Sequence, residues 1–167
     1  MEMEKKVNKS LDVTEDESEA VSRLVVPVIS PGGVSFYDAF VVRGIRVNRV
    51  ELGLVVCTLK VPPRFTFLSF VHDRGGNLAN GAIANLVDVL GFCAAYVPGH
   101  PMNVSVDISI SYMSTAKLHD ELEITSRLLG RIGRYSGTIV ILRNKTTGEI
   151  VAEGRQSFFS SRPIAKL

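Results

Sequence analysis

Residues 80–97 read NGAIANLVDVLGFCAAYV, and this stretch decides the fold. It is apolar on nearly every side when its residues are placed at about 100° each, which is typical of a buried α-helix. Its apolar part, from Ala82 to Val97, has 16 residues, fewer than the ~20 that a helix needs to cross a bilayer. Asn85 and Asp88 interrupt it as well. We therefore expect a central helix that the rest of the chain wraps, and no membrane span.

The predicted helix presents two stripes of different composition. The first is expected to face the main core and consists of Ile83, Val87, Leu90, Ala94 and Val97. The second holds small residues and a single charge: Gly81, Ala84, Asn85, Asp88, Gly91 and Ala95. Small side chains let another surface approach closely, and a carboxylate in such a contact needs a partner, a water molecule or a chemical role. Asp88 is therefore the first candidate for a functional residue.

The composition argues against several classes of function. The 167 residues are 46% hydrophobic and 22% charged, as expected of a globular chain with one domain. The net charge is only +2 and no Arg/Lys run is interleaved with aromatic residues, so nothing indicates nucleic-acid binding. Cys57 and Cys93 lack the spacing of a zinc site, so we expect two reduced, buried thiols and no metal.

Strand patterns lie on both sides of the helix. Two strands are predicted before it, within residues 44–61, with a tight turn at residues 51–53. Four strands are predicted after it, at residues 104–112, 121–129, 135–143 and 150–159. One long helix with about six antiparallel strands indicates an α+β fold in which the sheet curls round the helix. The apolar run at residues 65–71 can be an extra strand, a lid, a subunit contact or core filling, and the pattern does not choose among them.

The two ends of the chain are expected to differ from the domain at residues 21–160. Residues 1–20 carry an acidic cluster and few apolar side chains, so we expect a mobile segment. Residues 161–167 form a short tail that ends in Ala165, Lys166 and Leu167. This ending is a close variant of Ser-Lys-Leu, the address that the peroxisomal import receptor reads. The tail therefore predicts a peroxisomal protein, with the cytoplasm as the alternative.

Three segments of the chain resemble one known family. They are GAIANLVD at residues 81–88, VSVDISISYM at 104–113 with AKL at 116–118, and NKTTGEIVAEGR at 144–155. Through them the chain resembles the hotdog-fold thioesterases of the PaaI type, in particular the plant acyl-CoA thioesterase-like proteins. The resemblance implies a hotdog fold and hydrolysis of acyl-CoA without a metal or redox cofactor. It also implies a homo-oligomer, a dimer or a dimer of dimers, with each active site between subunits.

The same resemblance implies roles for individual residues. Asp88 matches the catalytic carboxylate, which activates a water molecule or attacks the thioester itself. Asn80 falls where the family has a Gly whose amide polarises the thioester carbonyl group. Ser105 matches a serine that lines the site from the partner subunit. Asp73 aligns with a polar residue, often Asn, near the attacking water.

Thioester hydrolysis needs little more than these groups. CoA leaves as a thiolate, and its thiol has a pKa near that of cysteine, about 8.5, so no strong general acid is required. The amides of Asn80 and Gly81 are unpaired at a helix start and can hold the developing oxyanion, each such donor being typically worth about 3 kcal/mol. Asp88 can supply the activated nucleophile. The phosphates of CoA predict basic residues at the entrance, and the candidates are Arg131, Arg134, Lys117 and Arg155.

These features favour an acyl-CoA thioesterase that releases CoA and a free fatty or aromatic acid. The alternative is a catalytically impaired hotdog protein that binds acyl-CoA or serves as a scaffold. Two departures from the family pattern favour it: Ala79-Asn80 in place of His-Gly, and Asp73 in place of the usual Asn. A third reading is a hotdog hydratase, but the Asp and His pair that this chemistry uses is not found in the sequence.

Overall fold

The computed structural model describes residues 41–66, 76–98 and 103–160, all of which belong to the unit Tyr37–Leu167. Within these ranges one long helix, α4 (Asn80–Ala95), follows the second strand and precedes the third. The strands are β1 (Ile45–Glu51), β2 (Leu54–Lys60), β3 (Asn103–Tyr112), β4 (Glu121–Ile132), β5 (Tyr135–Asn144) and β6 (Ile150–Ser160). A short 3-10 helix, Pro63–Phe65, follows β2. This order of elements confirms the one that the sequence predicts.

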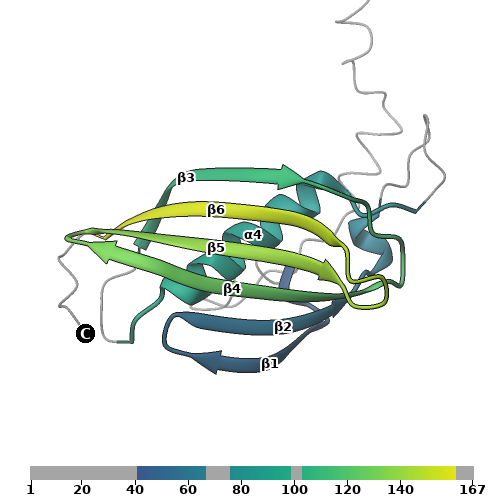
Figure 1. The fold of residues 1–167 in the computed structure, drawn as a ribbon, viewed down its shortest axis with the longest axis horizontal. Coiled ribbons are helices and arrows are strands. Elements are labelled where there is room, and N and C mark those ends of the chain that lie inside the picture. The colour runs from purple at the N-terminus through teal and green to yellow at the C-terminus, as the bar shows by residue number, and fades with distance from the viewer. Residues whose placement is uncertain (1–40, 67–75, 99–102, 161–167) are drawn as a thin grey trace, which may run out of the picture. The chain divides into compact units, whose positions relative to one another are not determined.

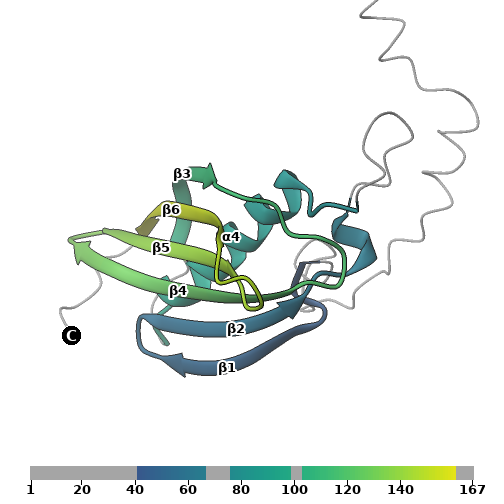
Figure 2. The same cartoon turned by 45° about the vertical axis from the view of Figure 1, so that its right-hand side comes forward.

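The six strands form one sheet in the order β1-β2-β4-β5-β6-β3. Every neighbouring pair is antiparallel. Figures 1 and 2 show α4 lying across one face of this curved sheet. The expected α+β hotdog fold is thereby confirmed. Strands β1 and β3 are the two edges of the sheet. β3 is the first strand after the helix in the chain, and it pairs with the last strand, β6.

The helix packs on the sheet through the predicted apolar stripe. Ile83, Val87, Leu90 and Ala94 are buried, as is Val97 just beyond the helix. Their core neighbours on the sheet are Cys57, Leu59, Leu122, Ile124, Val140, Leu142, Val151 and Ala152. Burial of this apolar surface stabilises the packing of the helix on the sheet.

The second stripe of the helix is less exposed than the sequence suggests. Gly91 and Ala95 are buried within the chain, whereas Gly81 and Asn85 are exposed and Asp88 is half-buried. The reason is that β6 curls under this flank and brings a side chain against Gly91. The expectation for the thiols also needs a correction: Cys57 is buried, but Cys93 is exposed.

The edge strand β3 is present as predicted, but its alternation does not bury one face within the chain. Val104, Val106, Ile108 and Tyr112 are between 40% and 60% exposed. An edge strand has a neighbour on one side only, and α4 covers only part of its inner face. Apolar side chains on a long, open edge are typical of a surface that pairs with another strand.

Several predictions concern residues outside the described ranges. These include the mobile segment at residues 1–20, the tail at residues 161–167 and most of the apolar run at 65–71. Of that run, Phe65 is buried in the core and Thr66 forms an isolated bridge with Leu78. Core filling therefore accounts for Phe65.

Candidate functional site

The carboxylate of Asp88 lies at a meeting point of three elements. The Ser105 hydroxyl on β3 donates a hydrogen bond to Asp88 Oδ1, with an Oγ–Oδ1 distance of 3.0 Å. Gln156 Nε2 on β6 donates to the same oxygen and also to Ser105 Oγ, at 2.9 Å. Within the described part of the chain, Asp88 Oδ2 accepts no hydrogen bond. One oxygen is therefore held in place while the other can take a proton or contact a ligand.

Ser105 reaches Asp88 because β3 contains a β-bulge. Ser105 pairs with Phe158 on β6 but Asp107 pairs with Ser157, so Val106 is an extra residue on β3. Phe158 is buried, with its ring centroid 6.3 Å from that of Phe92 on α4, and side chains directly opposite in a ladder share a face of the sheet. The bulge thus places Ser105 on the helix-facing side together with Ile108, whereas strict alternation would separate them.

This placement differs from the expectation that Ser105 lines the site from the partner subunit. The bond joins Ser105 and Asp88 of the same chain. Hence the two residues belong to the same half of any site that two chains share. Asp73, the remaining polar candidate, lies outside the described residues.

Gln156 belongs to this cluster although no sequence motif singles it out. It is only 2% exposed and lies where a Cβ atom on Gly91 would come within 2.2 Å of its Oε1. Its Oε1 and the nearby Thr138 Oγ1 are both buried and make no hydrogen bond with the residues described. One feature of the sequence points to this residue: the alternation along β6 places Gln156 on the inward face, between Gly154 and Phe158. A polar residue in that phase of a buried strand needs a partner, and Asp88 provides it.

The start of α4 presents the two amides that the sequence predicts. Ala82 N–H and Ile83 N–H both donate to Ala79 O, at 3.0 and 3.1 Å. The N–H groups of Asn80 and Gly81 make no hydrogen bond among the described residues, and both residues are exposed. Such a pair of amides at a helix N-terminus is suited to an oxyanion.

These amides and Asp88 lie too far apart to act together within one chain. Asp88 follows Asn80 by eight residues, which corresponds to about 12 Å along a helix axis. A carbonyl group held by the amides would therefore be out of reach of Asp88 of the same helix. The helix start and the carboxylate can therefore act on one thioester only if they come from two different chains.

The four basic candidates do not gather around Asp88. Arg131 Nη2 donates to Ala95 O at 2.9 Å, where a cation suits the helix C-terminus, and burial lowers the pKa of this guanidinium. Arg134 Nε donates to Ser160 O at 2.8 Å. Arg155 is next to Gln156 on β6 and so faces the other side of the sheet, where it pairs with Glu153. Lys117 is exposed.

The described ranges contain no group of three or more His, Cys, Asp or Glu side chains that could hold a metal ion. Nor does any helix in those ranges have the length and hydropathy needed to span a membrane.

Known proteins show clear similarity to this chain. A sequence model of the thioesterase superfamily matches residues 75–158. Acyl-coenzyme A thioesterase 13 of Homo sapiens is 37% identical over 107 residues, which are 63% of this chain and 71% of that protein. The crystal structure of zebra fish thioesterase superfamily member 2 has a TM-score of 0.66 at 30% identity and covers 90% of this chain and 100% of its own.

A more distant structure agrees in fold alone. It is that of a hypothetical thioesterase protein with coenzyme A from Streptococcus pneumoniae TIGR4, with a TM-score of 0.63 at 21% identity. The match covers 74% of this chain and 93% of that chain.

Proposed function

We propose that this chain, which belongs to the thioesterase superfamily and is a thioester hydrolase, hydrolyses a fatty or aromatic acyl-CoA to the free acid and CoA, at a site shared by two subunits. The observation that carries the proposal is the Asp88 carboxylate, in which Ser105 and Gln156 hold Oδ1 while no described residue donates to Oδ2. The similarity to acyl-coenzyme A thioesterase 13 supports acyl-CoA as the substrate class.

In the proposed reaction Asp88 acts on a water molecule. Oδ2 accepts a proton from the water while the water oxygen attacks the thioester carbon. The carbonyl oxygen becomes an oxyanion, which two backbone N–H groups stabilise. The carbon–sulfur bond then breaks, and CoA leaves as a thiolate that takes up the proton. Ser105 and Gln156 act as positioning residues, since they keep the carboxylate in one orientation without touching the substrate.

A second subunit completes the proposed site. Because the amides of Asn80 and Gly81 lie about 10–12 Å along the helix from Asp88 of the same chain, the proposal takes them from another copy of the chain. The open edge of β3, with four half-exposed apolar side chains, supports a contact there. A two-fold contact would create two equal sites, each with Asp88 from one chain and the amides from the other. The proposed assembly is a dimer or a dimer of dimers.

The remaining proposals concern recognition and location. Lys117 is exposed and is the candidate to contact CoA phosphates, whereas the three arginines are engaged by their own chain. The ending Ala165, Lys166 and Leu167 supports import into peroxisomes. A fusion of residues 161–167 to a fluorescent protein would test this address.

The catalytic proposal is tested by Asp88→Asn in a thiol-release assay with a panel of acyl-CoAs. The substitution keeps the size of the side chain and its ability to accept from Gln156, so the melting temperature should stay close to that of the wild type. Loss of the base should lower kcat by about 10²- to 10⁴-fold. Asp107→Asn is the matched control, because Asp107 lies on the same strand as Ser105 but pairs with Ser157 on the outer side of the sheet. Full hydrolysis by Asp88→Asn would refute the assignment.

The shared site is tested by mixing two inactive variants. Asn80→Pro removes one backbone N–H group from the start of α4. Pro is tolerated at the first position of a helix, and Ala79 already has the extended backbone conformation that a residue before Pro needs. Refolding Asp88→Asn together with Asn80→Pro should restore about a quarter of the wild-type activity, because half of the dimers pair unlike chains and each of those carries one intact site. No recovery in mixed dimers would contradict a site between subunits.

A further inference from the structure

Two buried oxygen atoms near Asp88 have no hydrogen-bond partner among the described residues. They are Gln156 Oε1 and Thr138 Oγ1, in residues that are 2% and 0% exposed. A buried polar atom without a partner lowers the stability of the fold, so such atoms are nearly always paired in proteins. A hydroxyl group can donate and an amide oxygen accepts, so one bond between these two atoms would satisfy both.

The two oxygens lie against the same point of α4. Thr138 on β5 and Gln156 on β6 are directly opposite in the ladder, so their Cβ atoms are about 4.5–5.5 Å apart on the inner face of the sheet. A Cβ atom on Gly91 would collide with Gln156 Oε1 and would lie 3.1 Å from Thr138 Oγ1. The outer neighbours in this row of the sheet are Leu128 on β4 and Ile108 on β3, and neither side chain can donate a hydrogen bond. Within the row, Thr138 is therefore the donor that Gln156 Oε1 can reach.

The amide group of Gln156 can face Asp88 in two ways. In the structure Nε2 donates to Asp88 Oδ1 and to Ser105 Oγ, which leaves Oε1 at Gly91. A half-turn of the amide would put Oε1 against the carboxylate, and two acceptors repel each other. This repulsion ends once Asp88 has taken a proton from water, because a protonated carboxyl group can donate to Oε1. A second contact is then needed to keep Nε2 in place.

We infer that Thr138 is a positioning residue, whose hydroxyl donates to Gln156 Oε1, directly or through one water molecule, and keeps Nε2 facing Asp88. The inference rests on the proposed hydrolysis of acyl-CoA, in which Asp88 takes a proton from water and the thiolate of CoA receives it. With the amide held, the protonated carboxyl group gains no bond to Oε1 and gives up its proton readily. Because Thr138 is fully buried, it acts on the rate of the reaction without touching the substrate.

Thr138→Val tests the inference, because it removes the hydroxyl group and keeps the shape of the side chain. In a thiol-release assay kcat should fall about five- to tenfold, as expected for the loss of one neutral hydrogen bond, while KM should stay within about twofold of the wild type. Thr138→Ser restores the hydroxyl group and should recover most of this kcat. Wild-type kcat in Thr138→Val, or an equal loss in Thr138→Ser, would overturn the inference.

A double variant separates action through Gln156 from a direct effect of Thr138. Gln156→Met removes the amide and keeps the length of the side chain, so it should lower kcat by itself. Adding Thr138→Val to Gln156→Met should cause little further loss, because the bond that it breaks is already gone. Losses that multiply in the double variant would contradict a positioning role through Gln156.

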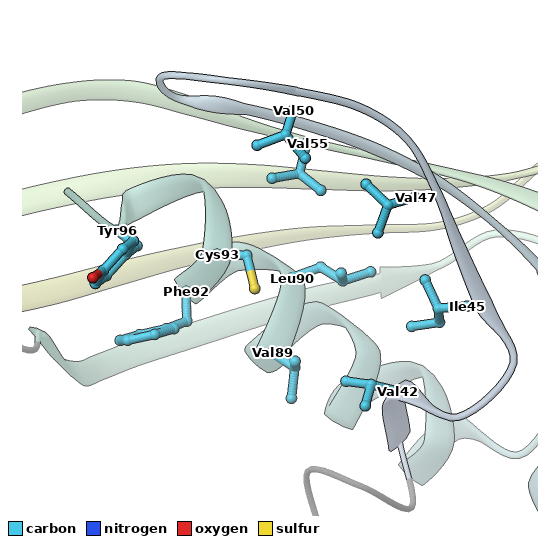
Figure 3. Close-up of a pocket in the computed structure, with 10 residues that line it drawn as sticks. All are labelled: Val42, Ile45, Val47, Val50, Val55, Val89, Leu90, Phe92, Cys93 and Tyr96. Atoms are coloured by element: carbon cyan, nitrogen blue, oxygen red, sulfur yellow. The ribbon is translucent and has the colours of Figure 1, made fainter. Parts of the chain in front are cut away.

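Thr58→Val is the matched control, because Thr58 is also a buried threonine. Its hydroxyl on β2 donates to Asn48 Oδ1 at 2.9 Å, and Asn48 is the extra residue of a β-bulge on β1. This hairpin lies at the edge of the sheet opposite to β3, where Figure 3 shows Val47 and Val50 facing α4 across an apolar pocket of about 560 Å³. Thr58→Val should lower the melting temperature through the lost bond and leave kcat at the wild-type value. An equal loss of kcat in this control would overturn the inference, since any buried hydroxyl group would then matter alike.

A magnetic-resonance measurement decides the inference even if no acyl-CoA is hydrolysed. The side-chain NH₂ signal of Gln156 is identified by its absence from the spectrum of Gln156→Met. In the wild type this NH₂ group should exchange its protons with water slowly, because both ends of the amide are held. Exchange should be at least about tenfold faster in Thr138→Val and slow again in Thr138→Ser. Equal exchange rates in the wild type and Thr138→Val would overturn the inference and leave the assignment of Asp88 untouched.

The melting temperature gives an independent check. If Thr138 bonds to Gln156, Thr138→Val leaves Oε1 without a partner and should melt below the wild type. A hydroxyl group with no partner predicts the reverse, because replacing it by a methyl group removes a buried polar atom. A variant that melts above the wild type would therefore overturn the inference.

Discussion

Replacing Gly91 by Ala should lower kcat although it removes no functional group. The added methyl group would lie 2.2 Å from Gln156 Oε1 and 3.1 Å from Thr138 Oγ1. An ordinary contact needs about 3.4 Å, so the Gln156 amide must move by about 1.2 Å. Such a shift should lengthen or misalign the Nε2 bonds to Asp88 and Ser105, because hydrogen bonds of this kind span about 2.7–3.2 Å and need a nearly linear geometry.

The expected size of the effect follows from the bond that is lost. A hydrogen bond to a charged group contributes about 1.5–3 kcal/mol, which corresponds to about a tenfold to a hundredfold change in rate if the orientation of Asp88 depends on it. Stability should change less. Ala favours a helix interior over Gly by about 1 kcal/mol, and the overpacking costs about 1–3 kcal/mol.

The assay is thiol release at saturating acyl-CoA, with a thermal melt of the same preparation. Gly130→Ala is the control for the exchange itself, because a Cβ atom there would meet nothing within 4 Å. In a Gln156→Met background, Gly91→Ala should cause little further loss of kcat, since the amide that it displaces is already gone. Wild-type kcat in Gly91→Ala, or losses that multiply in the double variant, would refute the argument.

Three further predictions follow from the described contacts. Ser105→Ala should lower kcat about tenfold with little change in melting temperature, because it removes one hydrogen bond to the Asp88 carboxylate from an exposed hydroxyl. Gly154→Ala should lower the free energy of unfolding by about 1–3 kcal/mol, read as a lower urea midpoint. The reason is that its Cβ atom would lie 2.4 Å from the buried, branched side chain of Val87. Adding Val87→Ala to the same chain should recover part of this stability. Burial raises the pKa of Cys57 from 9.0 to about 12, so the unfolded chain ionises first and stability should fall as pH rises from 9 towards 12. In Cys57→Ala, urea titrations across this range should show a smaller fall, and an equal fall would contradict the assignment.

The main elements of the fold were accessible from sequence because their patterns are local. The 3.6-residue period of residues 80–97 predicts α4, which ends two residues earlier than expected, and the turn at residues 51–53 is marked by Gly53 with φ of +77°. The stripe that includes Ile83 and Val87 lies against the sheet as predicted. Asp88 and the amides of Asn80 and Gly81 could be named in the same way, because a helix start and a lone charge on an apolar helix need no knowledge of distant residues.

The partners of Asp88 could not be deduced in this way. Strict alternation along residues 104–112 would place the side chains of Ser105 and Ile108 on opposite faces of the sheet. The extra residue Val106 puts both side chains on the same face. A bulge of this kind depends on the register with β6, about 50 residues further along the chain, and no local pattern encodes that register. The same reason hides Gln156, which meets Asp88 across 68 residues.

The sequence by itself therefore determined the helix, the strands and the chemical groups, because each follows from spacing within a single segment. Only the tertiary structure decided which groups meet: Ser105 and Gln156 on one oxygen of Asp88, and Val47 with Val50 facing α4. The placement of Ser105 and that of Val47 depend on single-residue bulges, whose position is set by the pairing of the strands. The contact of Gln156 with Asp88 depends on the close approach of β6 to the helix at Gly91.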